Sequence, residues 1–198
     1  YQAQWFGQKT YNGVALLSKS PATAVIRNIP GFADEQSRVL CATIEGVRVI
    51  GAYFPNGQEP GSDKFAYKMR WLDAMREWVR AEIAQHPQLV LMGDYNITFD
   101  DADVWDPAKF LGATHVTAAE RAAFTAMTEL GLHDVFPRAL KGDHPFTYWD
   151  YRDGSFHRGM GMRIDFVLAN TALKDAVTDA YVDRNARKGK GPSDHAPI

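Results

Sequence analysis

Four short segments concentrate polar side chains that the hydrolysis of a phosphate ester could use: Gly93-Asp94-Tyr95-Asn96, Arg163-Ile164-Asp165-Phe166, Ser193-Asp194-His195 and Gly51-Ala52-Tyr53-Phe54. In the first, Asp94 and Asn96 follow an apolar run, and the two-residue period of a strand would point both into one cleft. The carboxylate can hold or deprotonate a water, and the amide can donate to a phosphate oxygen. An Asx turn that ends the strand explains the same pair equally well.

The second and third segments contribute an aspartate and a histidine. Asp165 lies in an apolar run, where a carboxylate is costly unless it is paired. His195 is the partner that we expect, because a buried carboxylate orients a histidine and helps it to keep its proton. The alternatives are a surface turn at Ser193–His195 and a core role for Tyr53.

The bulk composition is that of an ordinary globular chain of 198 residues, with a net charge of −2. This charge argues against a protein that coats nucleic acid by bulk attraction. It does not exclude a nuclease whose acidic site has a local basic rim. The single cysteine, Cys41, cannot form an internal disulfide, which favours a reducing compartment, and we expect the cytoplasm. Cys41 itself is expected to be a small buried hydrophobe.

The elements that must position these residues follow from periodicity. Three- and four-residue spacing of apolar side chains predicts helices over 63–85 and 117–130, the second with Thr117 and Glu120 as a capping box. Glu45-Gly46 predicts a tight hairpin turn. Strands are expected over 13–18, 23–26, 38–44, 47–54, 89–92, 164–169 and 177–182. The pattern predicts one α+β domain with two packed sheets and helices outside.

Six segments in this order resemble the exonuclease III family of AP endonucleases, part of the endonuclease/exonuclease/phosphatase superfamily. They are Tyr11–Lys19, Gly51-Ala52-Tyr53-Phe54-Pro55-Asn56-Gly57, Leu91-Met92-Gly93-Asp94-Tyr95-Asn96-Ile97, Phe146–Arg152, Met162-Arg163-Ile164-Asp165-Phe166-Val167-Leu168-Ala169 and Pro192-Ser193-Asp194-His195-Ala196-Pro197. The resemblance implies a DNase I-like fold over 1–198: a four-layered α/β sandwich of two mixed sheets flanked by helices.

The resemblance also implies roles for individual residues. Asp94 would activate the attacking water, Asn96 would steady the phosphate, and Asp165 would orient His195, which stabilises the developing charge. Tyr53 would contact the scissile phosphate. The implied metal ligands are Asp94, Asn96 and Asp194, and the implied ion is Mg²⁺ or Mn²⁺, because these donors are hard oxygens.

An apolar pocket distinguishes the abasic-site enzymes within the superfamily. The resemblance places its walls at Tyr148 and Met162 and implies substrate contacts at Tyr148, Trp149, Met162, Arg163 and Ile164. Such a pocket accepts an extruded sugar that has no base to unstack; plain core packing is the alternative. The expected partner is double-stranded DNA with abasic sites or 3′ ends, bound by a monomer. Candidates for DNA backbone contacts, with solvated charge as the alternative, are Arg152, Arg158, Arg184, Arg187, Lys188 and Lys190.

The sequence departs from the family pattern at both ends. Family members begin with a strand that carries an asparagine, followed by the glutamate that is the principal metal ligand, and Glu35 and Glu45 lie in the wrong surroundings to replace it. We therefore expect a chain that lacks the N-terminal strands and the last C-terminal strand and that is inactive alone. The expected function is abasic-site endonuclease and 3′–5′ exodeoxyribonuclease. The alternatives are another DNase I-like phosphoesterase and an inactive DNA-binding fragment.

Overall fold

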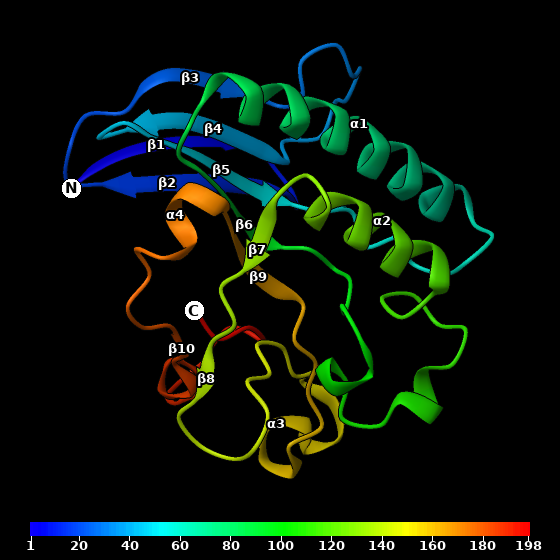
Figure 1. The fold of residues 1–198 in the computed structure, drawn as a ribbon. Helices are drawn as coiled ribbons and strands as arrows, with labels where there is room; N and C mark the ends of the chain where they lie inside the picture. Colours follow the sequence, from blue (N-terminus) through cyan, green and yellow to red (C-terminus); the bar gives the residue numbers. More distant parts are fainter.

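The computed structural model describes residues 1–198, and its centre is a six-stranded sheet in the order β3-β4-β5-β6-β9-β7 (Figure 1). The bounds are β3 Thr23–Arg27, β4 Val39–Ile44, β5 Val47–Tyr53, β6 Leu89–Asp94, β9 Asp165–Asn170 and β7 Leu132–Asp134. β5 and β6 run parallel, and the other neighbouring strands run antiparallel. The last residues of β5 and β6 and the first of β9 therefore meet at one edge.

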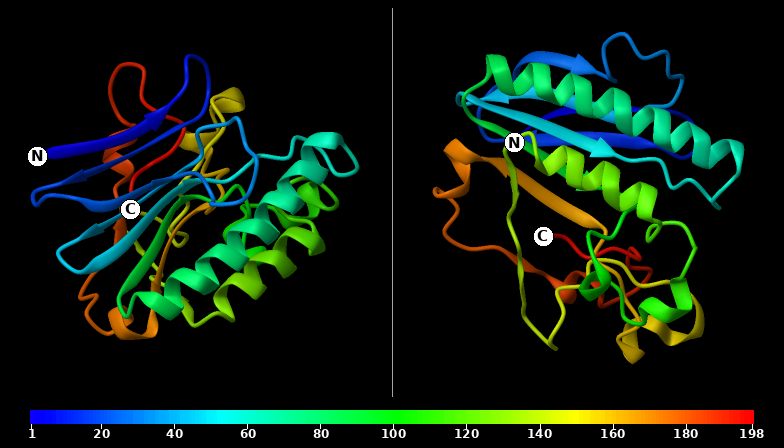
Figure 2. Two further views of the ribbon diagram at one scale, coloured as in Figure 1. Left: turned by 90° about the horizontal axis from the view of Figure 1, so that it is seen from above. Right: turned by 45° about the vertical axis from the view of Figure 1, so that its right-hand side comes forward.

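Two long helices, α1 (Asp63–Gln85) and α2 (Ala118–Thr128), lie side by side along one face of this sheet (Figure 2). The helix predicted over 63–85 is confirmed, and Ser62 caps it by accepting a hydrogen bond from the Phe65 N–H at 3.1 Å. The predicted capping box of Thr117 and Glu120 is also confirmed. Apolar side chains of both helices pack against the sheet in the main core.

The opposite face of β4 packs against a two-stranded hairpin of β1 (Gln2–Gly7) and β2 (Gly13–Ser18). Successive side chains of a strand point to opposite faces. Cys41 accordingly joins the helix-covered core, whereas Leu40 and Ala42 pack against Leu16 of the hairpin. The strand predicted over 13–18 is confirmed. The sequence predicts no strand at β1, whose apolar Trp5 is 69% exposed. Backbone pairing with β2 forms this strand, and its Phe6 packs against the cluster of Leu16, Leu40 and Ala42.

The strand predicted over 177–182 is wrong in extent. Only β10 (Tyr181–Val182) is a strand, and it pairs in parallel with β8 (Arg138–Ala139). Of the preceding residues, 177–179 are exposed, and only the Ala180 carbonyl group bonds to β8, accepting the Arg138 N–H at 2.9 Å, so this segment remains a loop. The hairpin turn is confirmed, since Glu45 and Gly46 both have positive φ angles, 49° and 83°, as its tight geometry requires.

The remaining elements are single turns: η1 Asp101–Asp103, η2 Pro107–Phe110, η3 Arg152–Gly154, α3 Ser155–Arg158, α4 Thr171–Lys174 and η4 Arg184–Arg187. None of the helices has the length and apolarity that crossing a membrane requires. Cys41 is fully buried, as expected, and burial raises the pKa of its thiol to about 12.

Candidate active site

Strand register assembles the centre of the site. Tyr53 lies opposite Asp94 across β5 and β6, and Asp94 lies opposite Asp165 across β6 and β9. Gly93 permits this close pairing: its φ is +140°, and a Cβ there would lie 1.9 Å from the carbonyl oxygen of Ala52. A phenol and two carboxylates from three strands thus share one edge of the sheet.

His195 completes the group from the end of the chain. Its Nδ1 lies 2.8 Å from Asp165 Oδ2, and its Nε2 lies 3.9 Å from Asp94 Oδ2. A bridge between the backbones of Tyr148 and His195 holds the histidine segment, and the Ser193 hydroxyl accepts the His195 N–H. The turn considered as the alternative is therefore present, and it carries the histidine into the site.

The Asp94–Asn96 pair forms an Asx turn at the end of β6 and also lies in the site, so both interpretations of this pair hold. Asp94 Oδ1 accepts the Asn96 N–H at 2.8 Å, which is an Asx turn, while Asn96 Nδ2 donates to Asp94 Oδ2 at 3.0 Å. Asn96 has a φ of 51°, a left-handed conformation that asparagine tolerates. The turn, rather than continued strand alternation, aims the amide at the carboxylate. Asn56, which the sequence analysis did not assign, donates to Asn96 Oδ1 at 3.0 Å.

The electrostatics separate the acid from the base. Burial raises the pKa of Asp94, and the charge of Asp165 raises it further, to about 7. Burial alone lowers the pKa of His195, but the hydrogen bond and charge of Asp165, with the charges of Asp94 and Asp194, raise it to about 9. His195 is therefore protonated at neutral pH, as a group that stabilises a phosphate oxyanion must be.

The donors at this edge fit a hard divalent cation. Carboxylate and amide oxygens are the ligands of Mg²⁺, which commonly uses one or two carboxylates together with substrate phosphates. The burial and mutual repulsion that raise the pKa of Asp94 are relieved by a cation. No three Asp, Glu, His or Cys side chains converge as a metal cluster by themselves. The expected ligands Asp94, Asn96 and Asp194 remain predictions.

A hollow of about 450 Å³ lies beside the catalytic group, and Tyr148 and Met162 line it. The two residues form a backbone bridge, and the Tyr148 ring lies 5.1 Å from the His195 ring. Its other walls include Trp105, Phe110, His115 and Met160. Half of its lining is polar, including Asp150, Arg152 and Asp153, so the hollow is not the apolar pocket that we expected. Tyr148 and Met162 nevertheless lie together beside the expected catalytic group.

Three other expected substrate contacts lie behind this hollow. Trp149 is fully buried and packs edge-on against Phe156 at 5.1 Å. Arg163, 2% exposed, forms ion pairs with Asp103 and Asp134, each at 2.6 Å. Ile164 is buried in a small core cluster with Met162. Direct substrate contact does not agree with this burial, so we assign all three supporting roles: they hold the walls and the strand that carries Asp165.

His115 is a site residue that sequence reasoning missed. Its Nδ1 lies 2.6 Å from the Asn96 carbonyl oxygen, which can only accept, so Nδ1 carries the proton and Nε2 is free to accept. Burial and the positive charge of Lys68 lower the pKa of His115 to about 4, so the ring is neutral. The sequence carried no signal for it, because a lone loop histidine has no ligand-like spacing.

The basic residues proposed to contact DNA divide into two groups. Arg152 forms an ion pair with Asp150 at 2.6 Å. Arg187 is only 7% exposed. The guanidinium groups of Arg187 and Arg184 lie over the Phe156 ring, 4.9 and 4.8 Å from its centroid. No ion pair engages the exposed Lys188 and Lys190 or the exposed Arg158. These three are candidates for phosphate contacts, together with Arg152, whose side chain is 84% exposed and lines the hollow beside Tyr148.

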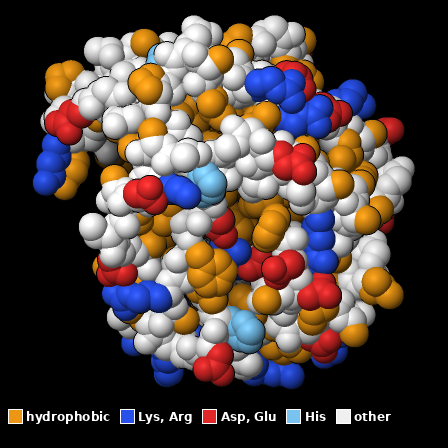
Figure 3. All heavy atoms as spheres, in the orientation of Figure 1, with side chains coloured by type: hydrophobic (Ala, Val, Ile, Leu, Met, Phe, Trp, Pro, Cys, Tyr) orange, Lys and Arg blue, Asp and Glu red, His pale blue; other side chains and the backbone are white.

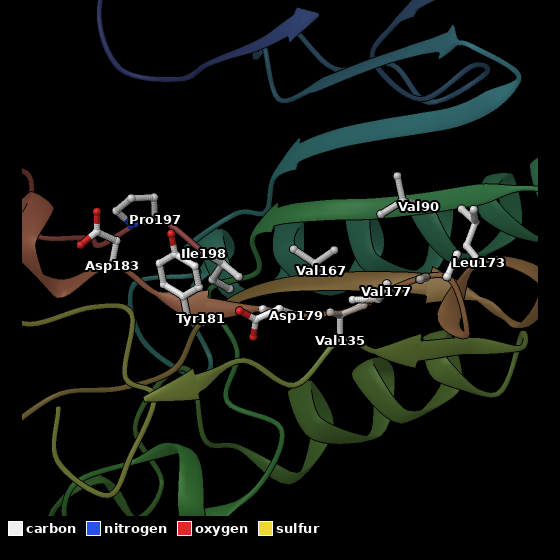
Figure 4. Close-up of a pocket in the computed structure, with 13 residues that line it drawn as sticks. Val90, Val135, Val167, Leu173, Val177, Asp179, Tyr181, Asp183, Pro197 and Ile198 are labelled. Atoms are coloured by element: carbon white, nitrogen blue, oxygen red, sulfur yellow. The ribbon is translucent and has the colours of Figure 1, made fainter. Parts of the chain in front are cut away.

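A larger hollow, of about 650 Å³, lies elsewhere (Figure 4). It lies along β6 and β9 and is lined chiefly by apolar side chains, among them Val90, Val167 and Val177. Apolar side chains are also visible in the central depression of the surface in Figure 3. None of the catalytic residues lines this hollow, so its size does not identify the chemical site. A neighbouring hollow of about 410 Å³ is lined by Tyr53, Asp94 and Asp165.

Comparison with known proteins defines the class. The model of the endonuclease/exonuclease/phosphatase family matches residues 1–195, and the chain belongs to this family, as its motifs predicted. It is 30% identical to exodeoxyribonuclease III of Haemophilus influenzae, over 100% of this chain and 79% of that protein. It is also 30% identical to an exodeoxyribonuclease of Bacillus subtilis, over 96% of this chain and 74% of that protein.

Solved structures agree with this assignment. The 3′ phosphatase NExo from Neisseria, bound to a product DNA hairpin, is 42% identical with a TM-score of 0.94, over 98% of this chain and 76% of that chain. An AP endonuclease from Archaeoglobus fulgidus is 30% identical with a TM-score of 0.93, over 99% of this chain and 77% of that chain. The predicted DNase I-like fold and the predicted nuclease class of hydrolase are confirmed.

Proposed function

We propose that this site hydrolyses phosphodiesters of double-stranded DNA at abasic sites and at 3′ ends, with a divalent metal ion as cofactor. Cleavage of abasic duplex by the 198-residue chain with Mg²⁺ would refute the expectation that this chain is inactive alone. The observation that carries the proposal is the aligned set of Tyr53, Asp94, Asp165 and His195, with the 2.8 Å contact between His195 and Asp165. The names of the relatives supply the substrate class. The single cysteine favours the cytoplasm as the location. We further propose that the protein acts as a monomer.

The side chains divide the reaction between them. Asp94 holds the attacking water and accepts its proton. His195, charged and held by Asp165, donates from Nε2 to a phosphate oxygen, with the Tyr53 hydroxyl as a second donor. Asn96 fixes the orientation of Asp94. Mg²⁺ or Mn²⁺, held by Asp94, Asn96 and Asp194, would neutralise phosphate charge when bound.

A second candidate, removal of 3′ phosphates, is favoured by the 42% identity to the Neisseria 3′ phosphatase. The same nucleophile and oxyanion donors serve a phosphomonoester. The difference lies in what the hollow beside Tyr148 and Met162 accepts: an extruded abasic sugar or a terminal nucleotide.

Three duplexes test these functions: one with an internal abasic site, one with a recessed 3′ hydroxyl and one with a 3′ phosphate, each with Mg²⁺. Asp94→Asn and His195→Ala should each lower turnover by about 10²–10⁴ with little loss of DNA affinity. His133→Ala, a histidine bonded to Thr171 away from the site, is the matched control. Binding without cleavage of any duplex would favour a DNA-binding module, and cleavage of a phospholipid head group instead would favour another phosphoesterase.

A further inference from the structure

A fully buried ion pair joins α1 to α2 directly behind the catalytic edge. Lys68 Nζ lies 2.5 Å from Glu120 Oε1, and both side chains are 0% exposed. Burying two charges costs more than their attraction returns unless further hydrogen bonds satisfy both groups. Such a pair is weak grounds for a role in stability alone, and the groups that it contacts indicate what it does.

Lys68 uses all three of its donors. Besides Glu120, its ammonium group donates to the carbonyl oxygen of Asn56 at 3.1 Å and to that of Asn96 at 2.7 Å. Asn56 belongs to the loop after β5, and Asn96 to the loop after β6. One charged group therefore ties together the two loops that follow the parallel strands of the site.

Glu120 fixes a third segment. Its Oε1 also accepts from the Thr114 hydroxyl at 3.2 Å and from the His115 N–H at 3.0 Å, while Oε2 accepts from Thr117. This segment forms a wall of the hollow beside Tyr148. The carboxylate thus holds one wall of the substrate hollow while it balances the charge of Lys68.

Asn96 transmits this order to the catalytic carboxylate. Its carbonyl oxygen accepts from Lys68 and from His115 Nδ1, so the orientation of its peptide is fixed twice. Its backbone N–H and its side-chain amide then donate to the two oxygens of Asp94, at 2.8 and 3.0 Å. Loss of Lys68 would release the turn that orients Asp94, although Lys68 touches neither Asp94 nor a substrate.

The chain offers an internal comparison. Arg48 and Glu82 form another buried ion pair at 2.6 Å, with side chains 2% and 9% exposed. Arg48 donates to Ala24 and Thr43, at the opposite end of β5 from Tyr53, and contacts no residue of the site. The two pairs match in burial and length and differ in what they position.

We propose that Lys68 and Glu120 are positioning residues, which hold Asn56, Asn96 and the wall at His115 in the arrangement that Asp94 needs for hydrolysis. The inference rests on the proposed function. It adds that the buried Lys68–Glu120 ion pair, which no substrate reaches, determines the geometry of the site.

The test compares Lys68→Met with Arg48→Met on the abasic and recessed duplexes, with kcat normalised to folded protein. Both changes should lower the unfolding temperature. Only Lys68→Met should lower kcat, by about 10²-fold, the loss that a misplacement of about 1 Å causes, with KM little changed. Lys68→Gln, which keeps an amide donor beside Glu120, should show a smaller loss, and it decides the question if Lys68→Met does not fold. Wild-type kcat in the Lys68 variants, or an equal loss in Arg48→Met, overturns the proposal.

A readout without turnover separates this proposal from the proposed function. The side-chain amide signals of Asn96 in a ¹⁵N-labelled protein should shift or broaden in Lys68→Gln and stay unchanged in Arg48→Gln. Unchanged Asn96 signals in both variants refute the positioning role, whatever the enzyme cleaves. Perturbed Asn96 signals in a protein that cleaves none of the duplexes would leave the positioning intact and refute the proposed function.

Discussion

Asp165→Asn is the sharpest test of the hydrolytic geometry, because it removes the charge that faces both His195 and Asp94 while it keeps the size of the side chain. The His195 Nδ1–Asp165 Oδ2 contact of 2.8 Å orients the ring, and an asparagine of the same size keeps the strand and the Asp165 N–H bond to Thr147. In Ser-His-Asp hydrolases the corresponding change lowers kcat by about 10⁴, and losing an oxyanion donor costs about 10²–10³. We expect a fall of about 10²–10⁴ in kcat, or roughly 2.7–5.4 kcal/mol in barrier height.

The pH profile gives an independent readout of the same change. The pKa of His195 is raised to about 9, chiefly by Asp165 among the raising causes, and the reaction needs the protonated ring. Activity should therefore fall on the alkaline side as the pH rises through about 9. In Asp165→Asn this fall should move to lower pH. Asp179→Asn, in an exposed pair with Arg138, is the control. The reasoning is refuted if Asp165→Asn keeps more than about a tenth of wild-type turnover, a deficit of only ~1.4 kcal/mol in the barrier, and if its pH–activity profile does not move.

The remaining predictions concern the metal, the hollow and the basic loop. Excess EDTA should abolish nicking of abasic duplex, and Mg²⁺ should restore it. The reason is that no side chain of the site can attack the phosphate with a neighbouring base to activate it. Undiminished cleavage in EDTA would contradict this prediction. Met162→Ala with Tyr148→Ala should narrow the preference for abasic over intact duplex, and a loss no larger than in Lys174→Ala would mean that the two residues only pack the core. Lys188→Ala and Lys190→Ala should each weaken DNA binding uniformly across sequences and reduce the salt dependence by about one phosphate contact; an unchanged salt slope argues against backbone contact.

The sequence by itself determined the features that are encoded locally. The apolar spacing over 63–85 and the Thr117–Glu120 capping box each define a helix within a few residues of chain, and both are confirmed. The Glu45-Gly46 turn is equally local. The motifs around Asp94, Asp165 and His195 predicted the family, which the comparisons confirm, and the structure brings these three residues together.

Only the tertiary structure decided which neighbouring residues face substrate and which support it. Tyr148 and Trp149 are adjacent in one motif, yet the first lines the hollow and the second is fully buried. The resemblance implies that Arg163 contacts the substrate, but its partner in the structure is Asp103, 60 residues away in the chain.

Lys68 shows most clearly that the sequence can indicate a buried side chain without identifying its partners. A lysine three residues after Phe65 and four before Leu72 falls on the apolar stripe of α1, which signals a buried charge. Its partner Glu120 and the carbonyl groups that it binds lie on other elements. Local periodicity fixes which face of a helix turns inward, but packing between distant segments decides what that face meets, and this site is built from such contacts.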